Sequence, residues 1–196
     1  TTQEIFEGLI TKSQNNWPNL QYDILSVNDL FSNFLGAGFY YKTFMWPKSF
    51  WEKIYEPFIR RAAGLGALSG LHNSDTYEKA YAFCDLLIIG GGPSGLMAAK
   101  IAAEAGLDVI LAEQEPIFGG RLNSETEKVD GIPGSDWAAK IIEELKKLDN
   151  VRLFLRTTVT GVYDQGTFAA VERVGHHLPD RGSDRPLECF WRIVAK

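Results

Sequence analysis

The stretch that decides the fold is Cys84-Asp85-Leu86-Leu87-Ile88-Ile89-Gly90-Gly91-Gly92-Pro93-Ser94-Gly95. It opens with residues 84–89, a run that is apolar apart from Asp85 and is typical of a parallel strand buried on both faces. Residues 90–95 fit the pattern G-x-G-x-x-G, and the alanine-rich residues 96–105 predict a helix. A strand, a glycine turn and a helix in this order predict a dinucleotide-binding βαβ unit.

The glycines of this turn have separate physical roles. Gly90 permits the tight turn out of the strand, Gly92 lets the backbone approach a pyrophosphate, and Gly95 lets the helix pack against the strand. Pro93 and Ser94 lie between them at the helix start, where free N–H groups and the helix dipole would hold phosphates. The alternative interpretation is a glycine-rich strand–helix turn that binds no ligand.

An acidic residue ends the second predicted strand. Residues 108–112 predict a second buried strand, and Glu113 ends it at the spacing where an acid hydrogen-bonds the ribose hydroxyls of a bound nucleotide. A carboxylate there would repel a 2′-phosphate, so the sequence favours NAD or FAD over NADP. Gln114 joins the candidate cofactor-binding residues, and Glu115 is the alternative acid if the register is shifted.

A second glycine pair follows soon after, in the segment Phe118-Gly119-Gly120-Arg121-Leu122. Such a pair recurs in flavoprotein-type nucleotide domains, where its backbone can pass close to the dinucleotide. Arg121 could offset phosphate charge; a plain turn with a surface arginine is the alternative. Val159, at the start of a later predicted strand, completes the candidate cofactor-binding residues.

The order of the remaining predicted elements indicates the fold class. A helix is expected over residues 137–148 and a third strand over 151–155. Residues 159–163 and 167–174 predict a hairpin, and residues 187–194 predict a further strand. This order predicts an α/β, Rossmann-like FAD/NAD(P)-binding domain of flavoprotein type over residues 83–196, with a parallel sheet plus a β-meander.

Residues 1–82 are predicted to form a separate, aromatic-rich N-terminal extension without a phosphate-binding motif. Phe50, Ile54 and Phe58 form one stripe of a predicted helix, which Pro57 should kink or split. The aromatic cluster within residues 37–58 comprises Phe39, Tyr40, Tyr41, Phe44, Trp46, Phe50, Trp51, Tyr55 and Phe58. This cluster fits either the core of a small subdomain or a surface that docks on another domain, with a membrane-surface role as a third alternative.

Composition excludes several classes of function. The chain has 196 residues and a net charge of −5, and this acidic balance argues against nucleic-acid binding. No apolar run approaches the roughly 20 residues of a membrane span. Cys84 and Cys189 are far apart and are expected to be buried thiols outside any redox motif. Few cysteines and the lack of a signal peptide favour a cytoplasmic protein.

No residue is assigned a catalytic role, because no nucleophile–base arrangement and no glycosidase-like carboxylate pair stands out. No metal site is predicted either. His176 and His177 lie beside Asp180 and Asp184 in a polar loop, and loops of this composition are usually solvated.

Across essentially all of its length the chain resembles the alpha subunits of heterotetrameric sarcosine oxidases. The glycine turn contributes, but the motifs in the first region are more specific. The resemblance rests on Ala37-Gly38-Phe39-Tyr40-Tyr41-Lys42-Thr43-Phe44, on Tyr55-Glu56-Pro57-Phe58-Ile59-Arg60-Arg61-Ala62-Ala63-Gly64-Leu65-Gly66, on Gly90–Gly95, and on the shorter segments Asp130-Gly131-Ile132-Pro133, Arg156-Thr157-Thr158 and Val171-Glu172-Arg173-Val174.

The resemblance implies an assembly that oxidatively demethylates sarcosine to glycine, forms peroxide and transfers the one-carbon unit to tetrahydrofolate. It implies NAD in this piece, FAD in the beta subunit, FMN at the alpha–beta interface, and partners beta, gamma and delta. The family's subunit is far longer, so the nucleotide domain is expected to lack its last strand and the isolated chain to be inactive. A related proline- or opine-type dehydrogenase and an FAD-binding amine oxidase-like domain are the alternatives.

Overall fold

The computed structural model describes residues 4–11, 13–14, 16–33, 36, 38–39, 46–64, 70, 72–179, 182 and 184–196. It divides into two units: unit 1 comprises Thr1–Leu9 and Ser74–Lys196, and unit 2 comprises Ile10–Asn73. The predicted boundary after residue 82 falls inside a strand, β1 (Tyr77–Cys84). Because β1 pairs along its whole length with a strand of the second region, the structure moves the boundary back to residue 73.

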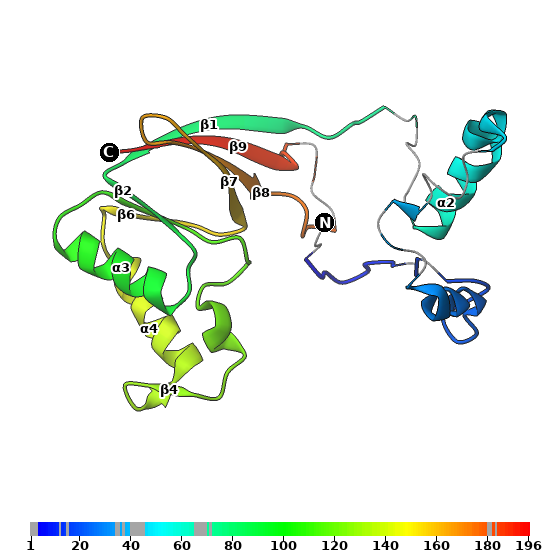
Figure 1. Cartoon of the computed structure of the whole chain (residues 1–196). Coiled ribbons are helices and arrows are strands. Elements are labelled where there is room, and N and C mark those ends of the chain that lie inside the picture. The colour runs from blue at the N-terminus through cyan, green and yellow to red at the C-terminus, as the bar shows by residue number, and fades with distance from the viewer. Residues whose placement is uncertain are drawn as a thin grey trace. The chain divides into compact units, whose positions relative to one another are not determined.

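Unit 1 contains the predicted parallel sheet. Its strands are β2 (Leu86–Ile89), β3 (Val109–Ala112) and β6 (Val151–Phe154), parallel throughout and adjacent in that order. Helices α3 (Pro93–Glu104) and α4 (Gly134–Leu145) cover one face of this sheet (Figure 1). The βαβ unit and the later helix and strand are therefore confirmed.

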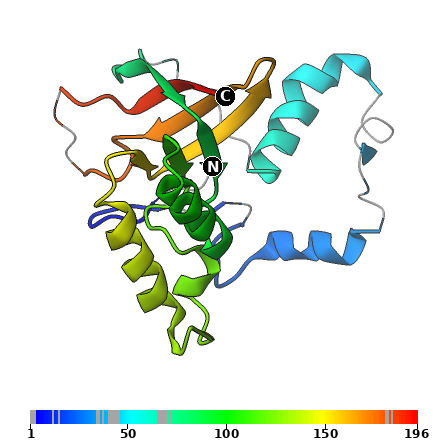
Figure 2. The ribbon, with the colours of Figure 1, turned by 90° about the vertical axis from the view of Figure 1, so that its left-hand side faces the viewer.

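The predicted meander forms a second sheet on the other face. Strands β7 (Thr157–Tyr163), β8 (Thr167–Arg173) and β9 (Glu188–Ala195) pair antiparallel in sequence order. β1 adds to them in parallel with β9, giving the order β1-β9-β8-β7. Figures 1 and 2 show the resulting layers in unit 1: helices, parallel sheet and meander sheet.

Central strand β3 explains why the layers hold together. Its side chains alternate between two buried clusters: Val109 and Leu111 pack with α3 and α4, while Ile110 packs with the meander sheet. All three are fully buried, as expected for a parallel strand covered on both faces. Within the described residues β2 pairs only with β3, and Ile89 at its end is 55% exposed.

Strand β1 was not predicted, and its side chains explain why. Tyr81 and Phe83 point outward and are exposed, whereas the small residues Ala82 and Cys84 face the core. Large residues outside and small residues inside invert the usual hydrophobic signal of a strand. The strand predicted over 84–89 accordingly begins only at Leu86, because Cys84 belongs to β1 and Asp85 separates the two sheets.

Between β3 and α4 lie the short elements η4 (Gly120–Asn123), β4 (Lys128–Val129) and β5 (Ile132–Pro133), of which the last two pair as a hairpin. Among the described residues, no helix has both the length and the apolar character needed to cross a membrane.

Unit 2 is helical. It contains the 3-10 helices η1 (Ile24–Phe31) and η2 (Lys48–Phe50), the π-helix η3 (Trp51–Tyr55) and α2 (Glu56–Ala62). Pro57, which was expected to kink or split the helix, lies in the first turn of α2; the π-helix η3 runs into α2 at Glu56 without a break. Tyr40, Tyr41 and Phe44 of the aromatic cluster lie outside the described residues.

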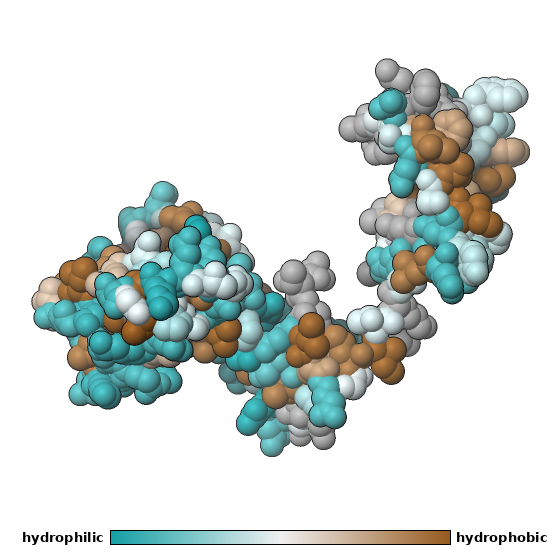
Figure 3. Space-filling view, turned by 90° about the horizontal axis from the view of Figure 1, so that it is seen from below, coloured by the Kyte–Doolittle hydropathy of each residue, from teal (hydrophilic) through white to brown (hydrophobic). Residues whose placement is uncertain are grey.

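The described part of unit 2 does not bury its apolar residues. None of its described residues is classed as buried, and hydrophobic surface is visible over the helical unit in Figure 3. The predicted helical stripe is exposed, at 43% for Phe50, 49% for Ile54 and 71% for Phe58, and Trp46 beside it is 84% exposed. Within this part of the chain, these side chains do not form the core of a subdomain.

Candidate nucleotide site

The glycine turn leaves β2 at the carboxyl edge of the parallel sheet. Gly90 has a φ of +100°, a conformation that side chains rarely adopt, and its N–H donates to the Ala112 carbonyl at 2.8 Å. A Cβ on Gly95 would lie 1.9 Å from the Gly90 carbonyl oxygen. The structure therefore gives Gly90 and Gly95 the steric roles expected from their spacing.

Gly92 differs from Gly95 because a Cβ at that position would meet nothing within 4 Å. It is the N-cap residue of α3, and no side chain caps the helix there. The first bond of the helix runs from the Leu96 N–H to the Gly92 carbonyl at 2.9 Å. The N–H groups of Ser94 and Gly95 precede that bond and are not used by the helix itself, while Pro93 has none to satisfy.

Glu113 holds the glycine turn in place. Its carboxylate accepts the Gly91 N–H at 2.6 Å and the Glu115 N–H at 2.9 Å. The side chain is buried, and only 7% of the residue is exposed. A carboxylate has about four acceptor positions, so two remain beyond these hydrogen bonds.

The second glycine pair packs backbone to backbone on the first turn. The Gly119 N–H donates to the Gly91 carbonyl at 2.8 Å, and a Cβ on Gly120 would lie 3.2 Å from the Gly92 Cα. Buried Phe118 covers Gly91, where a Cβ would stand 2.3 Å from a ring carbon. The structure thus brings together the two glycine segments and the acid that the sequence singled out separately.

Three other candidate residues have different surroundings. Gln114 is exposed, and its backbone carbonyl accepts a hydrogen bond from Arg173. The Arg121 guanidinium is paired with Glu125 at 2.5 Å and is 74% exposed. Val159 packs against the cluster between the two sheets. Among the described residues, none of these three side chains forms a hydrogen bond or ion pair with the glycine turn.

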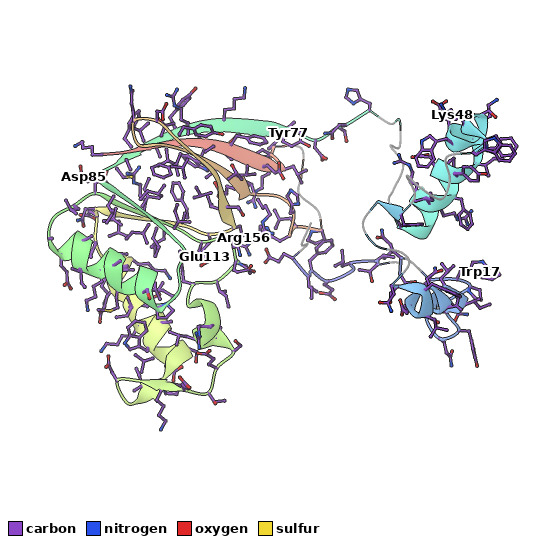
Figure 4. All side chains as sticks on the ribbon, viewed as in Figure 1. Trp17, Lys48, Tyr77, Asp85, Glu113 and Arg156 are labelled. Atoms are coloured by element: carbon purple, nitrogen blue, oxygen red, sulfur yellow. The ribbon has the colours of Figure 1, made fainter. Side chains whose placement is uncertain are left out.

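Sequence reasoning missed Gly91 and Phe118. Gly91 is a variable position of the motif, yet it supplies both the donor to Glu113 and the acceptor for Gly119. Position 91 requires glycine because the Phe118 ring packs against it. The two residues are far apart in the chain, so the spacing of the motif could not reveal this contact. Figure 4 shows Glu113 and Arg156 together at one end of the sheet and Asp85 at the other.

This arrangement can bind an extended anionic ligand along exposed backbone, with donors at the start of α3 and a fixed carboxylate beside them.

Among the described residues, no group of three or more His, Cys, Asp or Glu side chains is placed to hold a metal ion. Burial raises the pKa of both the Cys84 and the Cys189 thiols, which favours their uncharged form.

The segment that contains these residues is similar to known proteins. Residues 85–147 match the family model "FAD dependent oxidoreductase". The chain is 53% identical over 195 residues to sarcosine oxidase subunit alpha of Rhizobium meliloti (strain 1021), covering all of this chain and 20% of that protein. It is 35% identical over 136 residues to sarcosine oxidase subunit alpha of Corynebacterium sp. (strain U-96), covering 68% of this chain and 14% of that protein.

The chain thus spans about a fifth or less of the length of these two relatives. Among solved structures, L-proline dehydrogenase from P. horikoshii is similar with a TM-score of 0.46 and 25% sequence identity, over 67% of this chain and 24% of that one.

Proposed function

Over the part of their length that it spans, the chain belongs to the sarcosine oxidase alpha subunits, and from this premise we propose that it binds NAD as the nucleotide-binding part of such a subunit. The observation that carries the proposal is the bond between the buried Glu113 carboxylate and the Gly91 N–H. This bond joins the acid expected at the ribose to the turn expected at the pyrophosphate.

The residues present fit a dinucleotide. The open space beside Gly92 allows a ligand to approach the backbone, and the N–H groups of Ser94 and Gly95 would donate to the pyrophosphate oxygens. Glu113 has acceptor positions left for ribose hydroxyls, and the Gly119–Gly120 backbone would line the same edge. NAD would supply hydride-transfer chemistry when bound; these residues bind and orient it.

FAD is the second candidate for this site. The match of residues 85–147 to FAD dependent oxidoreductases supports it, because that segment includes the glycine turn, Glu113 and the second glycine pair. The same donors and carboxylate would serve the ADP half that the two cofactors share. Direct identification of the bound nucleotide separates the two candidates.

We propose further that the complete assembly oxidises sarcosine to glycine with flavins bound elsewhere: FAD in a beta subunit and FMN at the interface with it. Support comes from the names of the two alpha subunits to which the chain is similar. In this proposal no residue of the chain is catalytic, the isolated chain is inactive, and the working assembly is cytoplasmic. A substrate assay on the complete assembly, with sarcosine beside proline and an opine, tests the alternative substrates.

We propose that the exposed apolar side chains of unit 2, here called the aromatic stripe, contact the partner subunits beta, gamma or delta. Trp46, Phe50, Ile54 and Phe58 are all exposed, and large apolar side chains of this kind dominate the energy of protein interfaces. Replacing Trp46 or Phe58 with Ala should weaken subunit association about tenfold or more, measured by co-purification after co-expression. Lys53→Ala on the same helices is the matched control; equal retention by all variants would contradict the interface.

The experiment that tests the nucleotide proposal is a calorimetric titration of the purified chain with NAD and with FAD. NAD is expected to bind the wild-type chain, and Glu113→Ala is expected to abolish binding. Failure of the folded wild-type chain to bind either nucleotide would contradict the proposal.

A further inference from the structure

Two arginines and a histidine gather beside the proposed ribose site. Arg156 follows β6 and Arg173 ends β8, and the two are joined where the Arg173 N–H donates to the Arg156 carbonyl at 2.9 Å. The Arg156 N–H donates to the Glu115 carbonyl at 3.1 Å, and the Arg173 guanidinium donates to the Gln114 carbonyl. The Arg156 backbone and the Arg173 guanidinium are therefore anchored to the two residues that follow Glu113.

A carboxylate from the N-terminal segment lies against this cationic cluster of Arg156, Arg173 and His177. Glu4 pairs with Arg156 through both oxygens, at 2.6 Å to Nε and 2.8 Å to Nη2, in the two-pronged geometry that arginine gives to planar oxyanions. The two side chains are only 22% and 25% exposed. The hydrogen bond from Arg156 lowers the pKa of Glu4, helped by the charges of Arg156, His177 and Arg173.

Two further side chains of the cationic cluster, Arg173 and His177, act on Glu4 through their charge. Within the described part of the chain, Arg173 Nε and His177 Nδ1 are buried without a hydrogen-bond partner. Both Glu4 oxygens are already bonded to Arg156. An oxyanion with more oxygens than a carboxylate, such as a phosphate, could bond to Arg156 and to these remaining nitrogens as well.

The cationic cluster lies where a nucleotide ribose is expected to bind. In nucleotide domains of this type an acid at the second strand end holds the ribose 2′-hydroxyl, and a nearby arginine accommodates a 2′-phosphate. Here the Thr157 N–H, next to Arg156, donates to the Glu113 carbonyl at 2.8 Å. The cationic cluster thus lies directly beside the acid expected at the ribose.

We propose that Glu4 determines nucleotide specificity: its carboxylate pairs with the cationic cluster of Arg156, Arg173 and His177 and so excludes dinucleotides that carry a 2′-phosphate. This inference rests on the proposed nucleotide site. It adds a second determinant to Glu113, one supplied from a distant part of the sequence.

The test compares two probes of the ribose site, 5′-AMP and adenosine 2′,5′-bisphosphate, by calorimetric titration of the full chain. Glu4→Ala and Glu4→Gln are expected to bind the bisphosphate at least about tenfold more tightly than the wild-type chain, with 5′-AMP unchanged. Glu7→Ala, an exposed acid on the same segment, is the matched control and should behave as the wild type. Adding Arg156→Ala to Glu4→Ala should remove the gain.

The possible failures are distinguishable. If the wild-type chain binds 5′-AMP and neither Glu4 variant gains affinity for the bisphosphate, the specificity role is wrong while the nucleotide site stands. If the wild-type chain binds neither probe, both proposals fail. An equal gain for inorganic phosphate would make the cationic cluster a general anion site and overturn the specificity role. Loss of folding in both variants, seen by circular dichroism, would show that Glu4 is structural and would overturn it too.

Discussion

Three glycines of the turn, at positions 91, 92 and 95, differ in what a methyl group would meet. At Gly91 it would meet the Phe118 ring, and at Gly95 the Gly90 carbonyl, whereas at Gly92 it would project into open space. Gly92 also has a φ of −73°, which alanine adopts without strain. Glycine is therefore required at positions 91 and 95 by neighbouring atoms of the fold itself. At position 92 only a bound ligand would require it.

This contrast predicts opposite effects of alanine. Gly95→Ala should lower the free energy of unfolding by about 1–3 kcal/mol, because backbone must move to admit the methyl group. Gly92→Ala should change it by no more than about 0.5 kcal/mol and yet weaken nucleotide binding about tenfold or more. Urea denaturation and calorimetric titration measure the two quantities. Unchanged nucleotide affinity in folded Gly92→Ala would contradict close approach of the ligand at this position.

Glu113 carries both a structural and a binding expectation. Glu113→Gln keeps the side-chain shape but cannot accept from both the Gly91 and Glu115 N–H groups, since one of its two polar atoms is a donor. The free energy of unfolding should fall by about 1–3 kcal/mol, and nucleotide binding should weaken. Glu115→Gln is the control, because that exposed side chain is the alternative acid. A larger binding loss in Glu115→Gln would reassign the ribose acid.

The Glu4–Arg156 pair predicts a pH dependence of stability. The hydrogen bond from Arg156 holds the pKa of Glu4 below its ordinary value, so the folded state binds this proton less readily than the unfolded chain. The stabilisation is fully present above the unfolded pKa of about 4.3 and is lost as the pH falls through the lower folded pKa. The urea midpoint of the wild type should exceed that of Glu4→Gln from neutral pH to about pH 5, and the difference should shrink in acid. A difference that does not depend on pH would contradict an ionised Glu4.

At the scale of elements, the sequence predicted the parallel strands, both helices of unit 1 and the meander, because their apolar runs are long and bounded by turns. It also predicted which residues would meet at the carboxyl edge, since parallel strands end there together. It missed β1, whose outward aromatics resemble a core face. The pairing of Glu113 with Gly91 and the anchoring of Glu4 were equally hidden, because each depends on contacts between distant segments.

The observed orientation of β1 is open to a direct test. Ala82 is 4% exposed and Tyr81 is 67% exposed. Ala82→Leu should therefore destabilise unit 1 by about 1–3 kcal/mol through overpacking, whereas Tyr81→Thr should change stability by about 0.5 kcal/mol or less. Thermal unfolding followed by circular dichroism measures both. The reverse order of effects would place the opposite face of β1 against the core.

At the scale of the whole molecule, the two units divide the proposed tasks. Unit 1 has a layered core and carries the glycine segments, Glu113 and the cationic cluster of Arg156, Arg173 and His177. The described part of unit 2 exposes its apolar residues, which suits a surface covered by another subunit. Nucleotide binding is therefore expected to survive substitutions in the aromatic stripe, and partner association to survive Gly92→Ala.

The central claim is that unit 1 holds NAD. The most direct measurement is an absorbance spectrum of the purified full chain, followed by mass spectrometry of the nucleotide released on denaturation. The account predicts a colourless protein that releases NAD, or that takes up NAD when it is added. A yellow protein that releases FAD and does not exchange it for NAD would contradict the claim.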